Sequence, residues 1–245
     1  MRAGAGLVTL GIPGSLNQAI IKIKLKEVMT LPLPETKQGS LNLSGYQKIR
    51  DFLKDIDMLV IGPGLGQESS TQKLIRKLIR ETDKPLVIDA DGLNALVGHL
   101  KSLTPKTQHP KPIILTPHPG EMARLLGISV AKVQSKRKEI AKKFAQKYRV
   151  TVVLKGHNTV VADYKDRAYI NKTGNPGMST AGSGDVLTGM IAAFLGQGLD
   201  AFNAAKYAVY LHGLAGDLAA GEKTQISLIA SDIIDKIPEA IKKIR

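Results

Sequence analysis

Residues 171–185 form the stretch that most limits what this chain can fold into. The stretch contains Pro176, four glycines and several small hydroxyl or amide side chains, which leave almost nothing that could pack in a core. From residue 186 to residue 195, apolar residues recur at helical spacing with good helix formers between them. The sequence therefore predicts a glycine-rich loop that runs directly into a helix.

The junction between this loop and the helix is suited to an anion. Free N–H groups and the positive end of the helix dipole meet there, and the small residues 181–184 would let a phosphate approach closely. Asp185 follows at once and could accept a proton from a hydroxyl that attacks phosphorus. Aspartate at a helix start is also a common cap, and glycine loops are often only turns. Because about a dozen loop residues inside a compact domain are usually functional, we favour phosphoryl transfer.

Composition limits the class of protein. With 245 residues and 43% hydrophobic residues, we expect one domain over residues 1–245 with a substantial core. The absence of cysteine excludes disulfides and thiolate metal sites, and no signal pattern or membrane-length apolar run is present, which favours a reducing cytoplasm and no membrane partner. The net charge of +14 comes with only 4% aromatic residues, and many lysines fall on polar helix faces, so we expect a solvated basic surface and no nucleic-acid partner.

Apolar segments of strand and helix type alternate along the chain, which predicts an α/β fold with a mostly parallel sheet. Ligands of such sheets bind at the carboxyl ends of the strands. The expected strands cover residues 7–10, 20–31 (with Ile21, Ile23 and Leu25 on one face), 57–61, 86–89, 112–115 and 151–154, followed by an edge hairpin of strands 160–162 and 168–170. The expected helices cover residues 46–53, 71–80, 91–94, 122–126, 133–148, 186–195, 200–220 and 228–243, the last interrupted at Pro238.

Several polar or glycine-rich segments follow the expected strands. Residues 62–66 form a second glycine loop that could admit a ligand or be a plain turn. Asp89 could be catalytic, linked to a metal, or a carboxylate that caps a helix. Two prolines hold His118 in a preset direction, so this histidine could contact a substrate or be structural. Lys155 precedes a glycine and could meet a phosphate or remain in solvent.

Three motifs in one order resemble a known family. They are residues 116–121 (TPHPGE), residues 155–159 (KGHNT) and residues 174–185 (GNPGMSTAGSGD). Together they are similar to the ADP- or ATP-dependent NAD(P)H-hydrate dehydratases of the ribokinase-like superfamily, and the resemblance extends from Gly4 onward. It implies a ribokinase-like three-layer α/β/α fold. It also implies a nucleotide-repair lyase that removes water from (6S)-NAD(P)H hydrate, with ADP as the expected donor and AMP and phosphate as products.

The resemblance also assigns roles to residues. Asp185 would be the catalytic base and would contact the hydrate. The nucleotide site would include Lys155, Gly156, His157, Asn158, Thr159, Asn175, Ala181, Gly182, Ser183 and Gly184. The hydrate site would include Gly66 and the run from His118 to Arg124, with Gly120 and Glu121. No residue is expected to be a dedicated metal ligand, but we expect Mg²⁺ to accompany the nucleotide because few fixed positive charges lie near the phosphates in sequence.

The resemblance implies partners and one departure. Family members often form tetramers, and the reaction is coupled to an NAD(P)H-hydrate epimerase. Members usually begin with a further strand and a helix containing a Gly-Gly-Ser segment, so the chain is expected to be truncated relative to the family, without that strand, part of the hydrate pocket and an epimerase-like domain. Two alternatives remain: a ribokinase-like small-molecule kinase of the thiamine-precursor type, and a non-catalytic nucleotide-binding protein.

Overall fold

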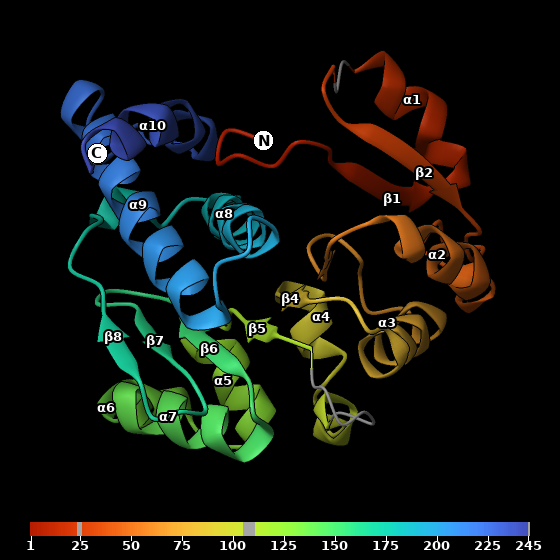
Figure 1. The fold of residues 1–245 in the computed structure, drawn as a ribbon, viewed down its shortest axis with the longest axis horizontal. Coiled ribbons are helices and arrows are strands. Elements are labelled where there is room, and N and C mark those ends of the chain that lie inside the picture. Colours follow the sequence, from red (N-terminus) through yellow and green to blue (C-terminus); the bar gives the residue numbers. More distant parts are fainter. Residues whose placement is uncertain (24–25, 105–110, 245) are drawn as a thin grey trace.

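The computed structural model describes residues 1–23, 26–104 and 111–244. Two sheets are present in these ranges: a six-stranded sheet in the order β3-β4-β5-β6-β7-β8 and a two-stranded parallel sheet of β1 and β2 (Figure 1). Strands β3 to β6 pair in parallel, whereas β7 and β8 complete the sheet as an antiparallel hairpin. The strands are β1 (Thr9–Pro13), β2 (Met29–Leu33), β3 (Leu59–Ile61), β4 (Leu86–Ile88), β5 (Ile113–Leu115), β6 (Thr151–Leu154), β7 (Val160–Ala162) and β8 (Ala168–Ile170).

Helices cover both faces of the large sheet, so the fold has three layers (Figure 1). The α-helices are α1 (Asn17–Lys22), α2 (Tyr46–Phe52), α3 (Ser69–Glu81), α4 (Ala90–Asn94), α5 (Pro119–Leu126), α6 (Val130–Ser135), α7 (Arg137–Tyr148), α8 (Ser183–Gly196), α9 (Ala201–Glu222) and α10 (Ala230–Lys242). Short 3-10 helices are η1 (Gly14–Leu16), η2 (Leu43–Gly45), η3 (Leu53–Asp55), η4 (Leu100–Leu103) and η5 (Pro176–Met178). Among the helices of the described ranges, none has the length and apolar character needed to cross a bilayer.

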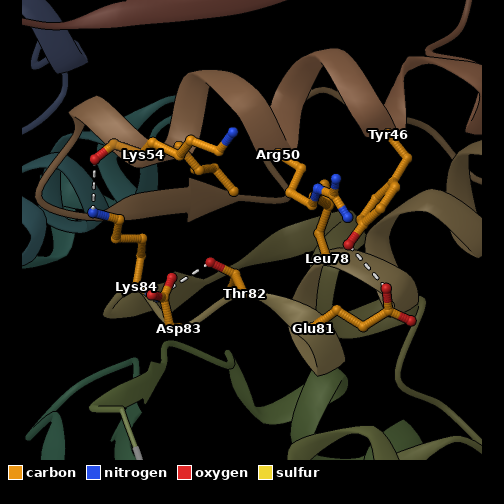
Figure 2. A pocket seen from close by; sticks show the side chains of 9 residues that line it. Tyr46, Arg50, Lys54, Leu78, Glu81, Thr82, Asp83 and Lys84 are labelled. Carbon is orange, nitrogen blue, oxygen red and sulfur yellow. Dashed lines mark hydrogen bonds between the residues drawn. The ribbon is translucent and has the colours of Figure 1, made fainter.

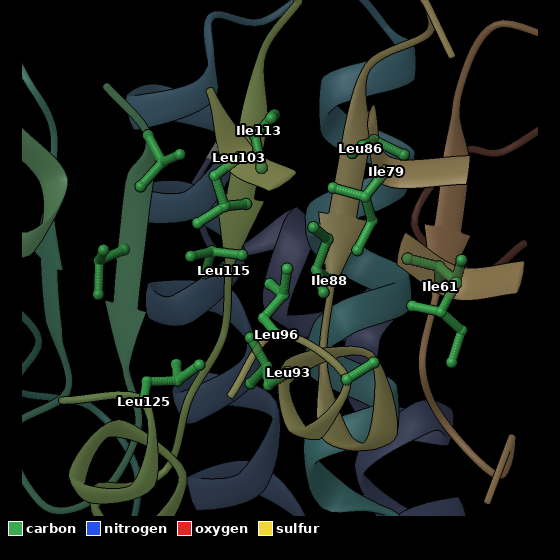
Figure 3. Packing of buried hydrophobic residues seen from close by; sticks show 14 of the residues in the cluster. Ile61, Ile79, Leu86, Ile88, Leu93, Leu96, Leu103, Ile113, Leu115 and Leu125 are labelled. Atoms are coloured by element: carbon green, nitrogen blue, oxygen red, sulfur yellow. The ribbon is translucent and has the colours of Figure 1, made fainter. Parts of the chain in front are cut away.

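Alternate strand residues enter two separate cores. Leu86 and Ile88 of β4 pack in a cluster with side chains of α3, α4, α5 and α7, part of which Figure 3 shows. Val87, between them, packs in the other cluster with α8, α9 and α10. Because the central strands are apolar on both faces, they need helices on both sides, which is what the continuous apolar runs in the sequence predict. The predicted α/β class and the mostly parallel sheet are confirmed.

Three local predictions are wrong. The segment beginning at Ile20 was expected to be a strand, but Asn17–Lys22 is helical and only Met29–Leu33 is a strand; the predicted face position Leu25 lies outside the described residues. Parallel pairing of β1 with β2 requires a crossover, and α1 supplies it. A few alternating residues cannot distinguish a strand from one or two helical turns.

The other two errors concern helix continuity. The expected helix over residues 133–148 is divided at Lys136, which has φ −134° and ψ 36°, so that α6 buries Val133 while α7 packs on β6 and β7. The expected interruption at Pro238 does not occur, because α10 continues through it. Ile237 and Ala240 on either side are buried among the α9 and α10 side chains, and this packing outweighs the cost of the proline.

Candidate active site

Asp185 lies in the first turn of α8, at the carboxyl edge of the large sheet. The helix cap is Gly182, so the Asp185 side chain is not the cap that its position in sequence allowed. Gly182 has φ +83°, a left-handed conformation that glycine adopts without strain. Ala181 and Gly182 are exposed, and Gly184 is half-buried, so the start of α8 is open to a ligand.

The first N–H groups of α8 differ in their bonding. Ser183 N–H donates to the carbonyl of Thr180 at 3.3 Å, whereas Gly184 and Asp185 N–H have no acceptor among the described residues. The cap position contributes no side-chain hydrogen bond. Two uncommitted N–H groups at a helix N-terminus, next to small residues, can bind an anion such as a phosphoryl group.

A buried ion pair lies beside this helix start. Asp89, which follows β4, is 1% exposed, and its Oδ1 accepts a hydrogen bond of 2.7 Å from Nζ of Lys155, which follows β6. Its Oδ2 accepts another of 2.7 Å from the Thr188 hydroxyl on α8. A Cβ on Gly184 would lie 3.4 Å from the same Lys155 Nζ, so the ammonium touches the first turn of α8. Lys155 is therefore not the solvent-exposed turn lysine that its sequence position also allowed.

The surroundings of Asp185 change its acidity. Partial burial, followed by the negative charge of Asp89, raises the pKa of the Asp185 carboxyl, and the Lys155 ammonium opposes this rise. Burial in a less polar environment disfavours the charged carboxylate, and a nearby like charge does the same. A raised pKa makes the carboxylate a better proton acceptor, as a general base requires.

His118 caps helix α5. Its Nδ1 accepts N–H hydrogen bonds from Gly120 at 3.0 Å and Glu121 at 3.3 Å, and Oε2 of Glu121 accepts from the His118 N–H at 2.7 Å. This reciprocal pattern is a capping box, in which a histidine takes the position of the usual serine or threonine. The ring's Nε2 lies 3.5 Å from Oε1 of Glu121, and half of the side chain stays exposed. The sequence left open whether His118 is structural; the structure shows a structural cap that still has an accessible face.

Gly66 and Arg124, which lies in the last turn of α5, are joined by a chain of polar contacts. The Gly66 N–H donates to Asp91 at 2.8 Å, and the side chain of Asn94 donates to the same carboxylate at 3.1 Å. The guanidinium of Arg124 in turn donates to Asn94 at 3.1 Å. The second glycine loop and the last residue of the run from His118 to Arg124 therefore belong to one network of polar contacts.

The segments predicted to line the nucleotide site are also neighbours. Asn171 N–H donates to the carbonyl of Thr159 at 2.9 Å, and Lys172 Nζ donates to Asn158 at 3.3 Å. The turn at residues 155–159 therefore lies beside the start of the glycine-rich loop. Within this turn Gly156 and His157 are exposed, so both can be reached by a ligand.

Asn175 is largely committed to holding the glycine-rich loop. Its Nδ2 donates to the Gly216 carbonyl at 3.0 Å and to Asp217 at 2.9 Å, and its Oδ1 accepts from Gly177 N–H at 3.0 Å. Asn175 thus fixes the loop on α9, with its side-chain amide already bonded to protein groups.

Three residues near the site escaped sequence reasoning. Asp217 accepts from Gly174 N–H at 2.8 Å as well as from Asn175, and so anchors the loop. Thr188 bonds Asp89 across 99 positions of sequence. His212 is buried on α9 with Nε2 3.4 Å from the Ser183 hydroxyl, and burial lowers its pKa to about 4, so it is neutral near pH 7. Such long separations leave no signal in a single sequence.

A cavity lies elsewhere on the molecule. It has a volume of about 570 Å³ and lies between α2 and the end of α3 (Figure 2). Its lining includes Tyr46, whose hydroxyl donates to Glu81 at 2.9 Å, and Lys84, whose Nζ donates to the Lys54 carbonyl at 3.3 Å. Because Lys84 precedes β4 and Asp89 follows it, this cavity lies at the opposite edge of the sheet from Asp185. None of the three sequence motifs contributes to its lining.

Comparisons with known proteins agree with this fold. A family model described as NAD(P)H-hydrate dehydratase matches residues 1–239. The bifunctional NAD(P)H-hydrate repair enzyme of Moorella thermoacetica is 46% identical over 244 residues, which cover 100% of this chain and 45% of the relative. The chain thus spans about half the length of this and other bifunctional relatives that it matches.

Two solved structures are similar over nearly the whole chain. The ADP/ATP-dependent NAD(P)H-hydrate dehydratase of Bacillus subtilis, co-crystallised with ATP and Mg²⁺, has a TM-score of 0.77 and 32% identity and covers 100% of this chain and 82% of that one. A ribokinase-like superfamily protein of Enterococcus faecalis has a TM-score of 0.81 and 26% identity and covers 99% and 78% of the two chains. The predicted ribokinase-like fold is confirmed, and the chain belongs to the NAD(P)H-hydrate dehydratase family.

Proposed function

We propose that this chain dehydrates (6S)-NAD(P)H hydrate with ADP as the phosphoryl donor and yields NAD(P)H, AMP and phosphate. The observation that carries the proposal is the position of Asp185. Its carboxylate, with a raised pKa, lies beside the Lys155 ammonium in the first turn of a helix whose cap, Gly182, makes no side-chain hydrogen bond. A base next to an anion site is what transfer of a phosphoryl group to a hydroxyl requires.

The proposed reaction has two steps. The hydroxyl oxygen of the hydrate attacks the β-phosphorus of ADP, the bond from that phosphorus to the AMP oxygen breaks, and Asp185 accepts the hydroxyl proton. The carbon–oxygen bond of the phosphorylated hydrate then breaks, phosphate leaves with the electron pair, and loss of a proton from the adjacent carbon restores the ring double bond. Phosphorylation turns a poor leaving group into a good one.

The remaining residues would bind and orient the two substrates. The N–H groups of Gly184 and Asp185 would receive the transferred phosphoryl group. The turn from Lys155 to Thr159 and residues 175–184 would line the nucleotide, and Gly66 with residues 118–124 would contact the hydrate. Hydrogen bonds from Asn171 and Lys172 to the turn and the close approach of Lys155 to Gly184 support the nucleotide set. The polar contacts from Gly66 to Arg124 support the hydrate set.

Mg²⁺ would accompany the nucleotide. In the described ranges no group of three or more His, Cys, Asp or Glu side chains is placed to hold a metal. Around Lys155, however, the carboxylates of Asp89, Glu121 and Asp185 outnumber the ammonium. A diphosphate entering this site would therefore need an additional cation, and Mg²⁺ bound to the phosphate oxygens would supply it.

The cellular setting is part of the same proposal. We place the reaction in the cytoplasm, in a homo-oligomer that could be a tetramer, and in functional coupling with an NAD(P)H-hydrate epimerase. The relatives of about twice this length are bifunctional NAD(P)H-hydrate repair enzymes, and a second repair activity in the same protein supports the coupling.

The test is recovery of reduced-nicotinamide absorbance from purified (6S)-NADPH hydrate with Mg²⁺ and either ADP or ATP. We expect recovery with ADP, loss of at least about a thousandfold in kcat for Asp185→Asn, and ADP binding by the variant close to that of the wild type. A stable phosphorylated product in place of NADPH would identify a small-molecule kinase instead. ADP binding with no turnover in wild type would favour a non-catalytic nucleotide-binding protein.

A further inference from the structure

Asp89 connects three elements of the active-site edge although it belongs to none of the three motifs. Its carboxylate accepts from the backbone N–H of Ala90 at 2.9 Å, from Lys155 at 2.7 Å and from Thr188 at 2.7 Å. These partners come from the start of α4, the end of β6 and the first two turns of α8. A buried carboxylate is costly to desolvate, and it is stable here because each oxygen has close donors and a cation balances its charge.

We propose that Asp89 is a positioning residue that fixes the Lys155 ammonium against the first turn of α8, where the transferred phosphoryl group would bind. The inference rests on the proposed function for the identity of that phosphoryl group.

The position of Lys155 is unusual for a lysine after a strand. Its side chain is only 18% exposed, and Nζ lies 2.7 Å from Asp89 and 4.0 Å from Glu121. A free lysine side chain samples many rotamers, and fixing it on binding would cost conformational entropy. Because Asp89 fixes Lys155 in advance, a cation already faces the first turn of α8 when an anion arrives.

Gly184 makes this approach possible. A Cβ at that position would lie 3.4 Å from Lys155 Nζ, and a longer side chain would enter the space between the ammonium and the helix start. Gly184 therefore leaves room for the Lys155 ammonium as well as for an anion at the helix start. The sequence alone does not reveal this, because the two residues come from separate motifs.

Two groups of opposite charge, Asp89 and Lys155, act on the pKa of Asp185. Asp89, from the end of β4, raises the pKa of Asp185, and Lys155, from the end of β6, lowers it. Glu121 on α5 reaches this group only through Lys155, and the buried His212 on α9 is neutral near pH 7. Removing Asp89 and removing Lys155 should thus move the titration of Asp185 in opposite directions.

The experiment measures two quantities in wild type, Asp89→Asn, Lys155→Met and Thr188→Val. The first is the titration of the Asp185 carboxyl by carbon-13 NMR in the ligand-free protein. The second is the pH profile of kcat and of KM for ADP. Thr188→Val is the matched control, because it removes a hydrogen bond to Asp89 but leaves every charge in place.

We expect the Asp185 titration of Asp89→Asn to move to lower pH and that of Lys155→Met to higher pH, each by roughly half a unit to one unit, with the acid limb of the activity profile following. Thr188→Val should lose stability without moving the titration. In Asp89→Asn, kcat should fall by about tenfold or more while KM for ADP changes less, since the lost alignment matters most in the transition state. Asp89→Glu, which keeps the charge, should retain the wild-type titration.

Two results would overturn the inference. One is an Asp89→Asn variant that loses stability only, with the Asp185 titration and the kcat of the folded fraction unchanged. The other is a Lys155→Met variant whose titration moves in the same direction as that of Asp89→Asn, and this result is readable even if Asp89→Asn does not fold. Failure of the proposed function would show separately, as wild-type protein that titrates as expected but does not recover NADPH.

Discussion

Helices α5 and α8 both begin at the carboxyl edge of the sheet, but their first turns are completed in different ways. In α5 the side chains of His118 and Glu121 satisfy the free backbone groups. In α8 the cap is Gly182, and the N–H groups of Gly184 and Asp185 have no acceptor in the described part of the chain. A protein that leaves a helix start unsatisfied next to a fixed cation keeps it available for an anion.

The same difference separates the roles of His118 at the start of α5 and Asp185 at the start of α8. His118 uses Nδ1 for its own helix, and so its structural role is defined without any ligand. Asp185 makes no cap, and its raised pKa has no evident use in folding. The α5 start is satisfied by its own side chains, whereas the α8 start leaves two N–H groups for water or a ligand.

Among the changes that test this comparison of helix starts, closing the α8 start should have the largest effect. Gly182→Ala forces a side chain into φ +83° and places Cβ 3.2 Å from the Ala230 side chain. We expect a loss of about 1–2 kcal/mol in stability and a fall on the order of tenfold or more in kcat/KM for ADP. Thermal unfolding and steady-state kinetics give the two values.

Gly98→Ala is the matched control for this variant. Gly98 has φ +73° and no neighbouring atom within 4 Å of an added Cβ. Alanine at this position would therefore carry similar backbone strain, and Gly98 belongs to none of the site segments. It should lose about 1 kcal/mol of stability and keep wild-type kcat/KM. Equal losses of kcat/KM in both variants would show that backbone strain, and not a change at the anion site, explains the effect of Gly182→Ala.

A smaller effect should follow from opening the α5 start. His118→Ala removes the cap and should lower the free energy of unfolding by about 1 kcal/mol. His118→Asn should restore this stability, because asparagine is a strong cap. If His118 also contacts the hydrate, both variants should show a KM for the hydrate raised several-fold or more; a KM restored together with stability would leave His118 with the cap alone.

The smallest effect should follow from a substitution in the cavity between α2 and α3, at the end of the sheet opposite Asp185. A hydrogen bond from Arg80, followed by that from Tyr46, lowers the pKa of Glu81 to about 2 from 4.5. The folded state therefore gains from this carboxylate above about pH 4.5 and loses the gain as pH falls toward 2. Because Glu81 and Arg80 lie near the surface, Glu81→Gln should lower the free energy of unfolding by at most about 0.5 kcal/mol at pH 7 and leave kcat unchanged. A large loss of turnover would move the search for the site to this cavity.

Much of the fold could be predicted because it depends on local patterns. Apolar runs such as residues 86–88 and the change to helical spacing after Asp185 identify the parallel sheet and the start of α8. Short segments failed, as at Ile20, where tertiary connection decides between helix and strand. Residue types at strand ends predicted a site at the carboxyl ends of the strands, and the structure brings Asp89, Lys155 and the start of α8 together there.

The geometry of the site could not be predicted to the same degree. The contacts of Asp89 span 66 positions to Lys155 and 99 to Thr188, so only the folded chain reveals them. The anchoring of the glycine-rich loop is similar: a Cβ on Gly216 of α9 would lie 2.2 Å from Sδ of Met178, which explains why this position of the alanine-rich helix is glycine. Such contacts decide which of several allowed roles a residue takes.

The central claim is that the hydroxyl of the hydrate receives a phosphoryl group before it leaves. The direct measurement uses hydrate prepared in oxygen-18 water, so that its hydroxyl oxygen carries the label, and follows the label by mass spectrometry during turnover with ADP. Transfer to that oxygen predicts that the label appears in inorganic phosphate. Label found in water, with unlabelled phosphate, would show that the hydroxyl leaves without being phosphorylated and would contradict the role proposed for Asp185 at the start of α8.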